Sequence, residues 1–456
     1  MEPTRSRNWC IRTLLLCIPL SATAASYAPM GDADLLGQSA TVVLGRVAHA
    51  GPAPAQELDA TLYRIEIDRI LKGSPGRRSL ELTVPGAHAP EQAGALVIPG
   101  APRFVPDERV LLFLDTGDSG RYRLNQFGLG AFHVRRAGDG TPLALRALEH
   151  EPLTRARGLD AFLHWLLQAT TGASPTVDYW TDMAPADSAK FNFIGVEASR
   201  WFEFDRGLEV RFLAHQNGQA GLSDGGVGAF RQGLAAWDDD GGSNIRYVFG
   251  GSTRAGGGLG TPDGVNTILF NDPNGEIAGS FDCNRGGILA LGGFRSSGRG
   301  EYRNGSFLMI VEGDVVVQDG AACQLSRNNG SNAAEVFAHE LGHTLGLAHS
   351  CGDNSLLGLI GDCIPLTPVD EALMRARTHA DGRGARLGAD DRAAVGSAYG
   401  NGLLPVLRDS PEGLPGANNV NGGDAGADDG GGGGGAAAVL TLLGLLAAGL
   451  WRTRTR

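Results

Sequence analysis

Three histidines and one glutamate near residue 340 constrain this chain more than any other feature of its sequence. In the run His339-Glu340-Leu341-Gly342-His343, a helix would place His339 and His343 one turn apart on one face, so both rings could reach one metal ion. Glu340 would lie beside that pair, within reach of a metal-bound water. Gly346 can adopt the positive φ that ends a helix, and the turned chain would bring back His349 as a third ligand. The spacing therefore predicts Zn²⁺ held by His339, His343 and His349, with Glu340 as the general base.

The same run resembles the zinc-binding motif of the metzincin peptidases, and the resemblance extends into neighbouring segments. Residues 372–374, Ala-Leu-Met, are similar to the methionine turn of that family, which implies that Met374 packs beneath the zinc. The likeness covers about residues 205–400 and implies a zinc peptidase domain. The further matrixin-like segments lie at 235–237, 243–249, 386–391 and 398–400.

Three features depart from the matrixin pattern. The 24 residues between His349 and Met374 form a longer segment than matrixins have. Arg and Ala at residues 375–376 replace the Tyr-Pro that matrixins typically carry, so the resemblance does not extend to this wall of the specificity pocket. No cysteine lies between Cys17 and Cys283, so the thiol latch of many matrixin zymogens is absent. Any latency must have another cause.

The first 25 residues predict a secretory signal peptide. Arginines precede an apolar core at residues 14–20, and the small residues Ala-Thr-Ala at 22–24 follow it. We expect cleavage after Ala24 or Ala25 and export of the chain. The apolar core is too short to span a bilayer, which argues against the alternative of a transmembrane anchor.

Four cysteines remain once the signal peptide is removed, and an even number in an exported chain predicts two disulfides. Three pairings are possible, and we favour Cys351 with Cys363, which are close in sequence, and Cys283 with Cys323. Metal-binding thiolates are the alternative, but the chain has no close cysteine pair or Cys-His cluster of the kind that binds zinc.

The C-terminal residues predict a contact with a membrane. A Gly-rich linker at 401–435 ends in six glycines, and the tail 436–456 consists of an apolar run followed by terminal arginines. This order resembles the bacterial Gly-Gly sorting tail, which is thought to be cut so that the protein is released. A plain membrane anchor is the alternative. Either reading exports the chain to the cell surface or the medium.

Residues 31–150 predict a small all-β domain, a barrel or sandwich, ahead of the peptidase domain. Apolar and polar residues alternate at 63–68 and 80–84, as in half-buried strands, and apolar runs at 41–44 and 110–114 predict buried strands. The sequence leaves open whether this domain is an inhibitory propeptide or a binding module.

Residues 151–200 predict a helix, at about 159–167, and a linker, and residues 201–400 predict the metzincin-like domain of an α+β protein. The second domain should open with a strand at 208–212 and a helix from about 227, capped by Asp224. Further strands are expected at 267–270 and 307–311. Three aspartates at 238–240 could hold a structural Ca²⁺, as in several matrixins, or be solvated.

The formal net charge of −11 argues against nucleic acid as a partner. Together these features predict an exported zinc-dependent endopeptidase that hydrolyses proteins or peptides through a zinc-activated water, with Glu340 as general base. The alternative from another class is a non-catalytic surface binding or adhesion protein built on a zinc domain.

Overall fold

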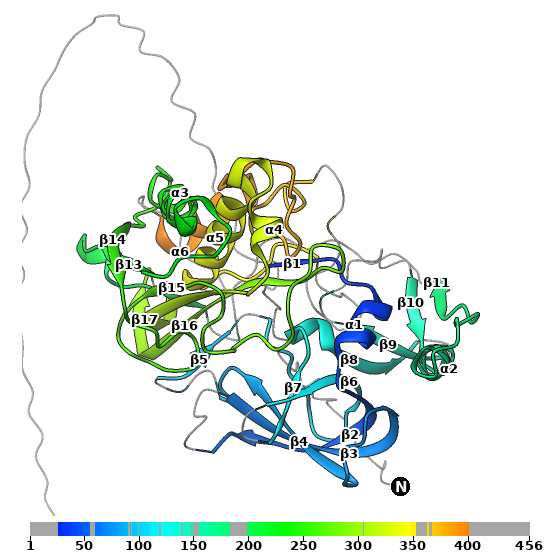
Figure 1. The fold of residues 1–456 in the computed structure, drawn as a ribbon. Coiled ribbons are helices and arrows are strands. Elements are labelled where there is room, and N and C mark those ends of the chain that lie inside the picture. Colours follow the sequence, from blue (N-terminus) through cyan, green and yellow to red (C-terminus); the bar gives the residue numbers. More distant parts are fainter. Residues whose placement is uncertain are drawn as a thin grey trace, which may run out of the picture. The chain divides into compact units, whose positions relative to one another are not determined.

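Two β-sheets, one of nine strands and one of eight, organise the residues that the computed structural model describes (Figure 1). Those are residues 26–400 except 55–59, 90–91, 93, 99, 118–119, 138–139, 147, 149–154, 183–197, 304, 353–362 and 364–366. The predicted signal peptide, Gly-rich linker and C-terminal tail all lie outside the described residues. Within the described part of the chain, no helix has the length and apolar character needed to cross a membrane.

Five strands of the nine-stranded sheet close into a barrel. β2 pairs with β3, β3 with β4, and β4 with β7, while β6 pairs with both β7 and β2. The predicted strands at 41–44, 63–68, 80–84 and 110–114 all belong to this ring. The barrel strands are β2 (Thr41–Pro52), β3 (Ala60–Lys72), β4 (Ser79–Pro85), β6 (Arg109–Thr116) and β7 (Tyr122–Leu124).

Alternation along the barrel strands explains why they form. Tyr63 and Ile65 are buried in the barrel core, while Arg64 and Glu66, which alternate with them, are exposed, as the period of two requires. The region is not purely β, because helix α1 (Asp32–Gln38) precedes the barrel. A short helix cannot be recognised from apolar spacing over seven residues, so the expectation of an all-β segment was too simple.

The nine-stranded sheet continues beyond the barrel into the residues predicted as helix and linker. Strands β8 (Ala131–Arg136), β9 (Pro142–Arg146), β10 (Arg155–Gly158) and β11 (Trp180–Asp182) continue outward from β6. Helix α2 (Leu159–Thr170) lies between β10 and β11 and buries Leu159, Phe162, Leu163 and Leu166. The helix was predicted, but its flanking strands were not, because three- and four-residue strands carry too little periodicity.

The eight-stranded sheet is built mainly from residues 201–400, the predicted metzincin-like domain. Its main order is β1-β16-β17-β15-β13-β14, with β5 added on β16 and β12 on β17. The strands are β1 (Ser26–Ala28), β5 (Leu96–Val97), β12 (Ser199–Arg200), β13 (Val210–His215), β14 (Tyr247–Thr253), β15 (Thr267–Leu269), β16 (Gly287–Tyr302) and β17 (Gly305–Val317). Two of them, β1 and β5, come from the N-terminal part of the chain, so the edge of this sheet at β16 is built from distant segments.

Helices α3 (Val227–Asp238) and α5 (Ser331–Thr344) pack against each other and share one hydrophobic core with the eight-stranded sheet. Trp237 is fully buried, and its Nε1–H donates to the carbonyl of Ala338 on α5 (2.8 Å). Helix α6 (Ala389–Tyr399) adds Val395 and Tyr399 to this core. The core therefore fixes α5, which carries two of the predicted ligands.

Two local predictions in this region were wrong. The first strand begins at Val210, and Leu208 is half exposed instead of pairing. The N-cap of α3 is Gly226, not Asp224, although Asp224 Oδ2 still accepts the N–H of Gly228 (2.8 Å). Its carboxylate thus satisfies a free amide of the first turn from a position two residues earlier than a normal cap.

Both predicted disulfides are present. Cys283 pairs with Cys323 across a separation of 40 residues, and Cys351 pairs with Cys363 across 12. The second bridge begins two residues after His349, the predicted third ligand.

Removing the Cys283–Cys323 bridge by a double Cys→Ser change should lower the free energy of unfolding by about 4 kcal/mol, because the unfolded chain gains the entropy of a 40-residue loop. Denaturant titration of oxidised wild type and variant would measure it. Reduced wild type and reduced variant, which both lack the two bridges, are the control and should have the same free energy of unfolding. Equal stability of oxidised wild type and variant would contradict the prediction.

Candidate metal centre

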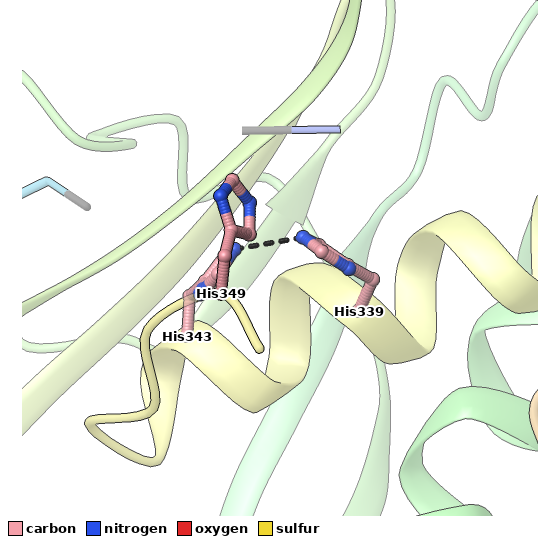
Figure 2. A group of neighbouring side chains, drawn as sticks. All are labelled: His339, His343 and His349. Atoms are coloured by element: carbon pink, nitrogen blue, oxygen red, sulfur yellow. Dashed lines mark hydrogen bonds between the residues drawn. The ribbon is translucent and has the colours of Figure 1, made fainter. Parts of the chain in front are cut away.

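Helix α5 places His339 and His343 one turn apart, and both side chains are buried, as is His349. Figure 2 shows the three rings turned toward one another, two from the helix and one from the chain that returns after it. One nitrogen from each ring lies within 4.8 Å of the other two, and within the described residues this is the group of side chains arranged to hold a metal ion. The structure thus brings together the three residues that the spacing selected.

Gly346 makes the return of His349 possible. Its φ is +90°, which an L side chain rarely adopts, and a Cβ atom at this position would overlap the carbonyl oxygen of Ser199. The helix ends just before it, with the N–H of Gly346 donating to the carbonyl of His343 (3.0 Å). Both the backbone conformation and the close approach of β12 therefore require glycine.

Backbone carbonyls fix the orientation and the tautomer of two rings. His339 Nδ1 donates to the carbonyl of Leu373, and His343 Nδ1 donates to the carbonyl of Leu347, each at 2.8 Å. A carbonyl oxygen can only accept, so both protons must be on Nδ1. Burial lowers the pKa of His339 and of His349 to about 3, and it also lowers the pKa of His343, so the rings are neutral.

Neutral rings with Nδ1 protonated present bare lone pairs at Nε2. The Nε2 atoms of His339 and His343 are 2.9 Å apart, joined by the dashed line in Figure 2. Neither can donate to the other, so the pair is repulsive unless a cation lies between them. Tetrahedral zinc, with Zn–N distances of about 2.0–2.1 Å, would hold such nitrogens roughly 3.3 Å apart. The donor set and its spacing fit a zinc ion after a small adjustment.

Glu340 is fully buried but is not part of the ligand group. Its Oε1 accepts the main-chain N–H of Ser26 (3.0 Å), in strand β1. Burial raises the pKa of this carboxyl to about 8, an effect that the Ser26 N–H partly opposes. The carboxyl group is therefore directed at the backbone of an extended strand.

Met374 lies under the ligand helix. It is 1% exposed, and a Cβ atom at Gly342, next to His343, would overlap its Sδ and the ring of Trp237. The absence of a side chain at Gly342 lets the methionine approach the helix at this position. The main chain around Met374 also reaches the return segment, since its carbonyl accepts the N–H of Ser350 (2.8 Å).

Asp391 is a site residue that reasoning from sequence missed. Its carboxylate accepts three main-chain N–H groups, from Leu373 (2.7 Å), Met374 (3.0 Å) and Gly388 (2.6 Å). Burial raises the pKa of this carboxyl to about 6. The hydrogen bonds hold the turn whose Leu373 carbonyl orients His339. The signal available was an aspartate in the matrixin-like segment 386–391, but its spacing gave no contact with Met374.

Arg375 stands where matrixins carry the Tyr of Tyr-Pro, and its side chain is not exposed. Its guanidinium is mostly buried and pairs with Asp370 (2.7 Å), while its Nε donates to the carbonyl of Arg377 (2.7 Å). The side chain therefore braces the segment after the methionine turn. The aspartates at 238–240 are not among the metal-holding groups of the described residues, and Asp240 pairs with Arg392 at 3.5 Å. Structural calcium stays a prediction.

His349→Ala should weaken the binding of zinc by more than about 100-fold, because two ring nitrogens cannot close the coordination shell. Competition with a zinc indicator dye measures the dissociation constant. His88→Ala, which removes an exposed histidine of the N-terminal region, is the matched control and should bind zinc as the wild type does. Equal affinity of the two variants would remove His349 from the ligand set.

Asp391→Asn should reduce zinc affinity about 10–100-fold, because an amide N–H₂ facing main-chain donors loosens the turn that orients His339. Zinc affinity and the melting temperature of the metal-free protein should be measured together. A lower melting temperature with unchanged zinc affinity would show that Asp391 stabilises the fold without positioning the ligand.

Comparison with known proteins agrees with this geometry. The model of the Matrixin family, Peptidase_M10, matches residues 188–362, which include the three histidines and Glu340 but end before Met374. A search of curated proteins finds no match. The family implies zinc, and the histidine triad could bind it. The family match and the triad together support a zinc metallopeptidase of the metzincin type in this part of the chain.

Proposed function

We propose that this protein is an exported zinc-dependent endopeptidase in which Glu340 is the general base. The observation that carries the proposal is the pair of bare Nε2 atoms, 2.9 Å apart, with His349 beside them and a buried carboxylate on the same helix. Three neutral imidazoles without a fourth protein ligand are typical of catalytic zinc sites, whereas structural sites usually fill all four positions with protein groups.

His339, His343 and His349 would hold the ion. When bound there, zinc polarises a substrate carbonyl and lowers the pKa of water to about 7. Glu340 would take a proton from the attacking water and deliver it to the nitrogen of the broken peptide bond.

A peptide backbone fits this site better than other hydrolysable groups. An extended strand on the edge of β16 already places a main-chain nitrogen 3.0 Å from Glu340. Strand pairing recognises the backbone of a substrate regardless of its side chains, which is how a protease can hold many sequences. This supports proteins or peptides as the substrates.

Export is supported by the two disulfides, which form and persist in oxidising compartments outside the cytoplasm. It also agrees with the signal-peptide pattern of the first 25 residues. In this proposal the tail at 436–456 retains the protein at a membrane or directs its sorting and release.

Glu340→Ala should keep zinc but lower kcat by about 1,000-fold, because the proton has no acceptor in the site. Hydrolysis of a quenched fluorescent peptide library and metal analysis of the same samples would test both halves of this statement. Glu301→Ala, which removes an exposed glutamate of β16, is the control and should leave the rate unchanged.

An unchanged kcat in Glu340→Ala would refute the assignment of the base. Wild-type protein that binds zinc stoichiometrically, has an accessible cleft and cleaves no peptide of the library would instead favour the non-catalytic binding protein.

A further inference from the structure

The first described strand of the chain lies in the place where a substrate would be expected. Residues Ser26–Ala28, β1, pair antiparallel with β16 through Ser26 and Ala290, Tyr27 and Ile288, and Ala28 and Gly287. On its other side, Tyr27 forms a parallel bridge with Arg377, three residues after Met374. The strand is therefore held between the sheet edge and the segment that follows the methionine turn. Figure 1 shows it as the short blue strand beside the yellow helices, and it contacts α5 directly.

The chain direction of β1 makes it equivalent to one half of a cleaved substrate. Ser26 contributes the nitrogen that donates to Glu340, and Tyr27 and Ala28 continue away from that point along β16. In the proposed reaction, Glu340 delivers its proton to the nitrogen of the leaving segment. The N–H of Ser26 occupies that position, so β1 is arranged like the leaving-group product of a cut immediately before Ser26.

Several buried contacts anchor this strand. Tyr27 is fully buried. The carbonyl of Met30 accepts hydrogen bonds from both terminal nitrogens of the buried Arg146, each at 3.4 Å. Asp32 pairs with Arg157 at 2.8 Å, with both side chains 2% exposed. Buried charge pairs of this kind are costly to break, so the residues that follow β1 hold it in place.

The N-terminal region also covers further parts of the β16 edge. Gln126 accepts the N–H of Ile288 with its Oε1 and donates from Nε2 to the carbonyl of Ser280, each at 2.9 Å. Further along, Val97 and Leu96 of β5 pair with Phe294 and Arg295. A substrate strand could not pair with β16 at 287–290 or at 294–295 while these segments remain.

We propose that Ser26–Ala28 is a built-in product mimic that fills the leaving-group half of the substrate cleft and keeps the peptidase inhibited. The inference rests on the proposed function, and it assigns residues 31–150 to inhibition, the role that the sequence left open beside a binding module. Cleavage of the signal peptide after Ala25 would give Ser26 a free α-amino group, which would donate to Glu340 from the same nitrogen. Latency then needs no cysteine.

The test compares full-length, zinc-loaded protein with the variant Tyr27→Asp, which places a charge at a fully buried position of β1. Releasing the strand should raise kcat/KM on a quenched fluorescent peptide roughly tenfold or more, because the rate follows the open fraction. The main-chain amides of residues 287–290 should exchange faster with deuterium. Ile70→Asp, at an exposed barrel position, is the matched control and should change neither quantity.

A peptide with the sequence of residues 26–30, Ser-Tyr-Ala-Pro-Met, should competitively inhibit Tyr27→Asp, and the reversed sequence should not. The double variant Tyr27→Asp/Glu340→Ala should lose the gained activity, which assigns that activity to this site. If Tyr27→Asp fails to fold, Tyr27→Ala takes its place in the same measurements.

A folded variant with unchanged hydrolysis and unchanged exchange at 287–290 would overturn the proposal. A different result would support the inhibition by β1 and refute the proposed function. In that case no variant hydrolyses peptides, but amide exchange at 287–290 rises in Tyr27→Asp, and labelled Ser-Tyr-Ala-Pro-Met binds this variant more tightly than wild type. The strand β1 would then fill the cleft, and the peptidase assignment would fail.

Discussion

Burial of three imidazoles around one point is the constraint on which this site depends. Water cannot reach these rings, so they stay neutral, and carbonyl oxygens take the Nδ1 protons of His339 and His343. What remains is a set of lone pairs that repel one another at 2.9 Å. A divalent cation bound between them would turn that repulsion into coordination. Metal binding and the stability of this region should therefore be coupled, as in other proteins where ligands converge only after folding.

The residues around the triad act through position and not through charge. Gly342 lets Met374 approach the helix, Gly346 lets the chain return with His349, and Asp391 holds the turn that orients His339. Each contact joins segments that are distant along the chain, and each is buried. Such supporting groups affect metal affinity nearly as strongly as some ligands do, because a ring that can rotate loses the geometry of coordination.

Much of this site could be predicted from the sequence because its signals are local. The spacing of His339, Glu340 and His343 needs only one helical turn, and Gly346 needs only one backbone angle. Alternation found the barrel strands, and helical spacing found α2 and α3. Asp391 and the short strands β1 and β5 were missed. Their contacts with Leu373 and with β16 depend on chain paths that no local pattern records.

The sequence by itself determined the donors: which side chains can bind a metal, which glutamate lies beside them, and which four cysteines can pair. Tertiary structure alone decided the occupant of the cleft. Ser26, Tyr27 and Ala28 match no motif. Their role follows from their pairing with β16, which places the main-chain nitrogen of Ser26 3.0 Å from Glu340. The physical reason is that ligand spacing is fixed by helix geometry over a few residues. The hydrogen bond between Ser26 and Glu340, which are 314 positions apart, forms only when buried contacts elsewhere bring both ends together.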